Sequence, residues 1–168
     1  MTSWWTHLLT ISVPVAFGVA VVLLAAVAWG RHAFTDDYPP AIRDRVAPPT
    51  RRELIAAWLW GGMFMLSVLA GCVTAMWTRS AGAGGGGLPT VYGSGVAFMA
   101  VLILVDLIFV DWLVVCRLRP SWVVPPGTED ADGWDDYAFH VKACLTPKAL
   151  AMLVVAPAVL LVPVALLT

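Results

Sequence analysis

The sequence predicts an all-α membrane protein, a bundle of four transmembrane helices with one short helix on the cytoplasmic surface. The 168 residues are 60% apolar and 12% charged, and their mean hydropathy is +0.84. Soluble domains carry about a quarter charged residues, so this composition excludes an ordinary soluble enzyme. Four segments are apolar over about 20 residues, which is the length a helix needs to cross a hydrocarbon core of about 30 Å.

Three of the predicted spans contain no Asp, Glu, Lys or Arg: Leu8 to Trp29, Leu54 to Trp77 and Ala149 to Thr168. The other span, Gly95 to Cys116, contains Asp106 and Asp111. No further stretch is long and apolar enough for a fifth span, so we expect a single membrane domain over residues 1–168.

The orientation follows from the basic residues, because short loops rich in Lys and Arg stay in the cytoplasm. Nine of the ten Lys and Arg residues lie in segments 30–53 and 117–148, and only Arg79 lies on the other side. Tryptophans near the ends of the predicted spans agree with this assignment. We therefore expect a plasma-membrane protein with both termini outside, whose first span is retained rather than cleaved.

Two stretches of small residues predict a helix-packing surface and a connector. In the second span Ser67, Gly71 and Ala75 recur at four-residue spacing, a stripe that seats either the third span or a second copy of the chain. The glycine-rich run 81–87 lacks the Gly-Lys-Ser/Thr ending of a phosphate-binding loop, so we expect a flexible connector there.

Charge and motifs exclude several function classes. The net charge of -1 excludes a nucleic-acid binder that works by neutralising phosphates. The sequence has no zinc-ligand spacing and no Gly-x-Ser-x-Gly, and all three histidines lie outside the predicted spans, which disfavours haem. We predict no cofactor and no metal, with the lipid bilayer, and either a membrane-protein partner or a second copy, as the partners.

Asp106 lies at the midpoint of the third predicted span, where an ionised carboxylate costs roughly 2.5 to 3.5 kcal/mol. None of the predicted spans offers a Lys, Arg or His partner, so the side chain should face the bundle interior. It is either a neutral structural group, hydrogen-bonded to Ser67, Thr74 or a backbone carbonyl, or a proton or cation site.

Asp111 follows five residues later, about 140° around an α-helix and about 7.5 Å nearer the cytoplasm. We therefore expect the two carboxylates not to share a face. Asp111 should instead pair with Arg117, with Arg119 or with an arginine of segment 30–53.

The second cytoplasmic segment predicts a surface helix over Asp135 to Leu145, because apolar residues recur there at helical spacing. Asp136 and His140 fall one turn apart, close enough for a hydrogen bond. The acidic run that begins at Glu129 is expected to be a solvated loop rather than a cation site. The tripeptide Asp-Asp-Tyr occurs at 36–38 and 135–137, a weak sign of a duplicated helix pair.

Three short motifs carry a resemblance: the residues from Asp106 to Trp112, Pro126-Gly127-Thr128-Glu129, and Asp136-Tyr137-Ala-Phe139-His140. Together they resemble a family of small uncharacterised bacterial membrane proteins with four helices. The resemblance implies the same fold and brings no activity with it.

Two function classes remain. The first is a non-enzymatic bundle that assists a partner or handles protons or small cations through an inward-facing carboxylate. The alternative is a membrane-embedded enzyme acting on a lipid or other apolar substrate, with acidic and histidine side chains at the cytoplasmic mouth. The enzyme requires the candidate residues to approach one cavity: Asp106, Asp111, Glu129 and His140, with Asp136 beside His140.

Overall fold

The structure is a computed structural model, which describes residues 3–82 and 87–167. The elements within these residues are all helical, so the predicted all-α fold is confirmed. Four helices are long and apolar enough to cross a membrane: Trp4–Asp37, Arg51–Ser80, Leu88–Leu118 and Pro147–Leu167. Most of the glycine-rich connector, residues 83–86, lies outside the described residues.

Each long helix extends beyond the apolar segment that predicted it, because backbone hydrogen bonding continues into polar sequence. The first helix comprises α1 (Trp4–His7), a π-helical turn η1 (Leu8–Ser12), α2 (Val13–Gly30) and a 3-10 segment η2 (Arg31–Asp37). The second helix, α4 (Arg51–Ser80), begins at a capping box in which Thr50 and Glu53 satisfy each other's backbone N–H groups.

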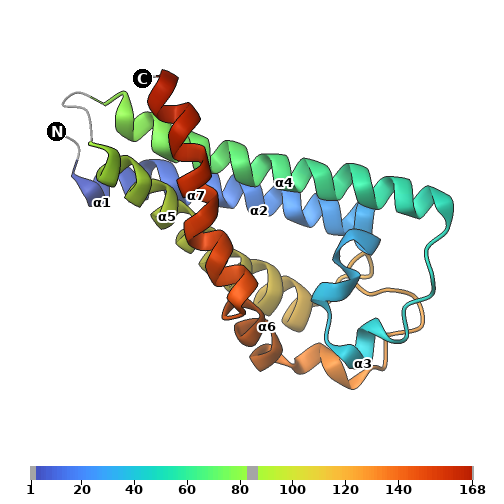
Figure 1. The fold of residues 1–168 in the computed structure, drawn as a ribbon. Coiled ribbons are helices and arrows are strands. Elements are labelled where there is room, and N and C mark those ends of the chain that lie inside the picture. Colours follow the sequence, from blue (N-terminus) through green and yellow to red (C-terminus); the bar gives the residue numbers. More distant parts are fainter. Residues whose placement is uncertain (1–2, 83–86, 168) are drawn as a thin grey trace.

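The helices form a wedge (Figure 1). Helices α2 and α4 run side by side, and α5 (Leu88–Val105) packs on both of them. Its continuation η3 (Asp106–Leu118) diverges from α4, while α7 (Pro147–Leu167) crosses α5 and α4. We call α5 and η3 together the third helix.

Small residues allow the close approach of α4, α5 and α7. A Cβ atom on Gly71 would lie 2.5 Å from Cζ of the fully buried Phe98, and Ser94 Oγ donates a hydrogen bond to the Ala75 carbonyl at 3.2 Å. The small-residue stripe of the second span therefore seats the third helix. A Cβ atom on Gly95 would lie 2.9 Å from Cβ of Pro157 on α7.

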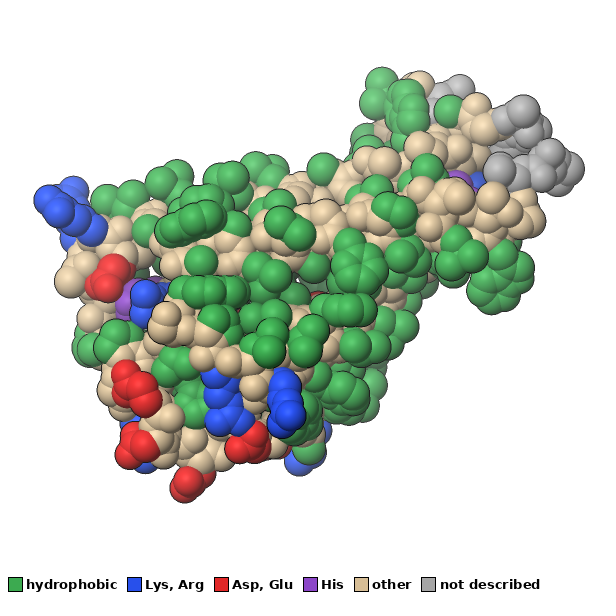
Figure 2. Space-filling view, turned by 180° about the vertical axis from the view of Figure 1, so that it is seen from behind, with side chains coloured by type: hydrophobic (Ala, Val, Ile, Leu, Met, Phe, Trp, Pro, Cys, Tyr) green, Lys and Arg blue, Asp and Glu red, His purple; other side chains and the backbone are tan. Residues whose placement is uncertain are grey.

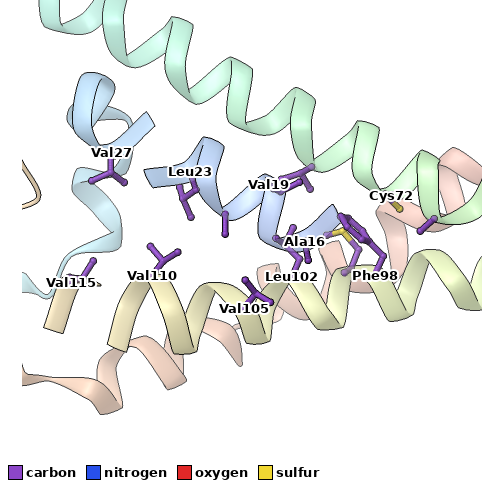
Figure 3. Close-up of a cluster of buried hydrophobic side chains, with 14 of the residues drawn as sticks. Ala16, Val19, Leu23, Val27, Cys72, Phe98, Leu102, Val105, Val110 and Val115 are labelled. Carbon is purple, nitrogen blue, oxygen red and sulfur yellow. The ribbon is translucent and has the colours of Figure 1, made fainter. Parts of the chain in front are cut away.

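The hydrophobic core lies mainly between α2 and the third helix. In Figure 3 valine side chains along the third helix point toward α2, whose buried side chains point back at them. The labelled members of this cluster are Ala16, Val19, Leu23 and Val27 on α2, Cys72 on α4, and Phe98, Leu102, Val105, Val110 and Val115 on the third helix.

The open side of the wedge is filled by segments 30–53 and 117–148, which we call the polar end. These segments contain α3 (Pro40–Arg43), η4 (Asp132–Asp135) and α6 (Tyr137–Cys144). Charged side chains gather at this end, whereas the outer faces of the long helices are largely apolar (Figure 2). This is the distribution expected of a membrane protein.

The polar end has a small core of its own. The Tyr38 ring packs edge-on against Trp134, with 5.7 Å between ring centroids, and the Tyr38 hydroxyl donates to the Val123 carbonyl at 3.0 Å. Trp134 Nε1 donates to the Thr128 carbonyl at 2.7 Å, and Ile42 is fully buried. Burial raises the pKa of Tyr38 to about 12, so at neutral pH its hydroxyl remains a hydrogen-bond donor.

Candidate functional site

A cavity of about 250 Å³ lies where the polar end meets the first and third helices. Its walls are mostly apolar and include Leu23, Phe34, Phe64, Ile103 and Val115. Five polar side chains also line it: Asp37, Tyr38, Asp106, Asp111 and His140. A largely apolar pocket with a few convergent polar groups is the usual form of a ligand or reaction site.

The backbone of η3 brings Asp106 and Asp111 to the same side of the third helix. From Asp106 to Leu118 the helix is π-helical, so its hydrogen bonds join residues five apart, and such residues lie closer together around the axis than in an α-helix. Both carboxyl groups consequently line the cavity. The expectation that they lie on different faces was wrong, because it assumed α-helical winding.

The π-helical segment ends at Arg119, whose backbone is left-handed with φ 45°. The Arg119 N–H donates to the Val114 carbonyl at 2.9 Å, again across five residues. Its side chain donates to the Cys116 carbonyl at 2.7 Å and forms an ion pair with Asp135. Arg119 thus ends the helix and joins it to the polar end.

His140 is the partner of Asp111. Its Nδ1 lies 3.2 Å from Asp111 Oδ2, and the residue is only 5% exposed. A neutral imidazole that carries its proton on Nδ1, beside this carboxylate, has its lone pair on Nε2. The predicted pairing of Asp111 with an arginine was wrong, since Arg119 binds Asp135 instead.

Helix α6 presents His140 to the cavity, and Asp136 begins that helix. The Asp136 carboxylate accepts a hydrogen bond from the Phe139 N–H at 2.9 Å, as N-cap residues do. The predicted Asp136–His140 hydrogen bond was therefore wrong, because the capping carboxylate turns toward the helix N-terminus. The helix predicted over Asp135 to Leu145 is present, over Tyr137–Cys144.

Asp106 faces the cavity with no hydrogen bond or ion pair to any other residue that the structure describes. The two side chains expected as structural partners are occupied elsewhere. Ser67 Oγ donates to the Phe64 carbonyl at 2.7 Å, and Thr74 Oγ1 donates to the Ala70 carbonyl at 2.8 Å. Both hydroxyls bond within their own helix, so neither side chain fixes Asp106.

Sequence reasoning missed Asp37 and Tyr38 as cavity residues and overvalued Glu129. The only sequence signal for the first two was the Asp-Asp-Tyr repeat, which says nothing about where the side chains point. Glu129 is exposed and is not among the residues that line the cavity. Its neighbour Asp130 pairs with Arg45 at 3.0 Å on the surface.

The cavity carries an excess of acidic groups. Three carboxyl groups and one imidazole line it, and its described lining includes neither Lys nor Arg. Among the residues with described positions, no group of three His, Cys, Asp or Glu side chains is arranged to hold a metal ion. Such a lining favours cations other than a multiply coordinated metal.

Cys144 also lines the cavity, one helical turn after His140. Burial, together with the nearby Asp111 and Asp106 carboxylates, raises the pKa of its thiol. Reactive cysteines have a lowered pKa in an electropositive environment. Cys144 is therefore a protonated wall residue and does not resemble an activated nucleophile.

We compared the chain with protein-family models, curated proteins and solved structures, and none of them matches.

Proposed function

We propose that this is a non-enzymatic integral membrane protein that binds protons at the cavity and moves them across the membrane. The observation that carries the proposal is the Asp111–His140 contact at 3.2 Å, with Asp106 on the same cavity one π-helical turn farther from the polar end. Ionisable groups inside membrane helices are costly and commonly form proton pathways.

The chemistry assigned to each residue follows from its contacts. His140 Nε2 would accept a proton, and the Asp111 carboxylate at Nδ1 would stabilise the imidazolium that results. Asp106, which has no fixed partner, would exchange the proton with this pair. The apolar walls would limit the water that could bypass the three residues.

The same proposal includes an orientation. With nine of ten basic residues in segments 30–53 and 117–148, the polar end would be cytoplasmic and both termini outside the plasma membrane. In a background without native cysteines, Ser80→Cys should react with a membrane-impermeant reagent in intact cells. Ser121→Cys should react only after permeabilisation, and the reverse pattern would overturn the orientation.

Proton movement can be measured in proteoliposomes that contain a pH-sensitive dye and carry a potassium diffusion potential. The wild type should acidify or alkalinise the lumen faster than empty liposomes, depending on the sign of the potential. Asp106→Asn and His140→Gln should lose this flux, because the new amides cannot titrate. Asp132→Asn, a carboxyl change outside the cavity, is the control and should behave as wild type. Equal flux in all proteins would refute the proposal.

A second candidate, an enzyme for a lipid or other apolar substrate, is favoured by one observation. A carboxylate at Nδ1 orients an imidazole for general-base chemistry, and the Asp111 carboxylate lies 3.2 Å from His140 Nδ1. The cavity of about 250 Å³ is smaller than pockets for drug-sized ligands, roughly 300–1,000 Å³, and Glu129 does not reach it. This candidate predicts that cells expressing wild type and His140→Gln differ in lipid composition by mass spectrometry.

A further inference from the structure

We propose that the cavity binds a small organic monocation, a protonated amine that carries one apolar group. This inference rests on the proposed function in one respect: the amine would exchange with the proton at the same carboxyl groups. Four features of the cavity lead to this ligand class, namely its charge, its unpartnered polar atoms, its walls and its volume.

The charge of the lining selects a cation. Asp37, Asp106 and Asp111 contribute carboxyl groups, and only His140 can oppose them. Buried charges are stable only when they are paired. A ligand with one positive charge would supply the counter-charge that the described lining lacks.

The unpartnered atoms select a hydrogen-bond donor. The Asp106 carboxyl group makes no hydrogen bond to another described residue. His140 is 5% exposed and uses only Nδ1, so its Nε2 has no partner within the described chain. An ammonium group has three N–H donors and no acceptor. It can therefore donate both to a carboxylate and to the imidazole lone pair.

The walls and the volume select a small ligand with an apolar part. Phe34 and Phe64 both line the cavity, in edge-to-face contact with 5.8 Å between ring centroids, and aromatic faces attract cations. Leu23 and Ile103 extend the apolar surface. The absence of a three-ligand cluster among the described residues argues against a metal ion, and the volume of about 250 Å³ suits a ligand smaller than a drug-sized molecule.

The test compares two probes of the same shape, benzylammonium and the neutral benzyl alcohol. Binding to the purified full-length chain in detergent would be followed by isothermal titration calorimetry, with protein-free micelles as the blank. Benzylammonium should bind saturably, and benzyl alcohol should bind at least about tenfold more weakly, because it lacks the charge. Asp106→Asn should weaken benzylammonium binding about tenfold, whereas Asp132→Asn should not change it.

A second variant tests the place of binding without changing charge. Ala149 lines the cavity from α7 and is partly exposed, so Ala149→Leu should fold and reduce the space. It should weaken benzylammonium binding, and unchanged binding in both Ala149→Leu and Asp106→Asn would overturn the inference.

The outcomes separate this inference from the proposed function. Equal binding of the two probes would show a merely apolar pocket and overturn the inference. Failure of benzylammonium to bind a protein whose proton flux depends on Asp106 would also overturn it and leave the proposed function standing. Saturable, Asp106-dependent binding without any proton flux would support the ligand class and refute proton movement.

Discussion

The imidazole Nδ1 of His140 on α6 lies 3.2 Å from the Asp111 carboxylate on η3. This contact joins the polar end to the third helix, between side chains that are 6% and 21% exposed. It also places His140, the one imidazole of the described cavity lining, against one of the three carboxyl groups described there. The position of α6 and the chemistry of the cavity therefore depend on the same pair.

We expect the Asp111–His140 pair to show energetic coupling. The two side chains of this contact are only 21% and 6% exposed, and removing one of them leaves the other without its partner, which costs about 1–3 kcal/mol. A double-mutant cycle with Asp111→Asn and His140→Gln, followed by unfolding in detergent, should give a coupling of about 0.5–3 kcal/mol. The surface pair Arg45–Asp130 is the control and should give about 0–1 kcal/mol. Additive effects at the buried pair would contradict the prediction.

Gly71 and Gly62 lie on the same helix but should differ in their response to alanine. A Cβ atom on Gly71 would lie 2.5 Å from Phe98 Cζ and 3.1 Å from Val15 Cγ1, whereas one on Gly62 would meet nothing within 4 Å. Phe98 is fully buried and has little room to move, so Gly71→Ala should cost about 1–3 kcal/mol. Gly62→Ala should change stability by about 0.5 kcal/mol or less. Equal thermal midpoints for the two variants would show that this contact is not as tight as the structure has it.

Two substitutions at Arg119 distinguish the cost of its left-handed backbone from the contribution of its side-chain contacts. Its left-handed φ of 45° costs an L-residue about 1–2 kcal/mol but costs glycine little. Arg119→Gly and Arg119→Ala both remove the ion pair with Asp135 and the hydrogen bond to Cys116. The glycine variant should therefore be more stable than the alanine variant by about 1 kcal/mol. An alanine variant as stable as the glycine variant would place Arg119 outside the left-handed region.

Stability should fall at high pH because of Tyr38. Burial raises its pKa from the ordinary 10.0 to about 12, so the folded protein holds this proton more tightly than the unfolded chain does. The resulting stabilisation is fully present below about pH 10 and is lost as the pH rises toward about 12. Tyr38→Phe should cost about 1 kcal/mol at neutral pH, through the hydrogen bond to Val123. The difference in thermal midpoint between Tyr38→Phe and the wild type should then become smaller as the pH rises above about 10. A difference that stays constant with pH would count against a buried Tyr38 hydroxyl.

Hydropathy sufficed to find the four long helices, because the bilayer imposes an apolar length that composition reveals directly. It could not locate their ends. The first helix continues to Asp37, past the last apolar residue, since helical hydrogen bonds do not require apolar side chains. The inward orientation of Asp106 was also predictable, because an ionisable group is costly in lipid.

The Asp111–His140 pair was not predictable in the same way. It depends on the π-helical winding of η3 and on the Asp136 cap that orients α6. One signal was present: Val105, Val110 and Val115 are all buried and recur every five residues, which α-helical winding would spread around the helix. The role of Asp37 depends on how two polar segments fold on each other, and such long-range packing leaves no periodic pattern.

The π-helical winding of η3 makes the spacing between Asp106 and Asp111 a property that can be tested by itself. Where side chains five apart share a face, their alignment is set by the number of residues between them. Inserting one residue between Asp106 and Asp111 would place them six apart and turn the second carboxyl group away from the first without replacing either, whereas a deletion would leave them four apart on one face. The number of residues between the two acids can therefore be varied independently of their identity, and a one-residue insertion tests their alignment while keeping both carboxyl groups.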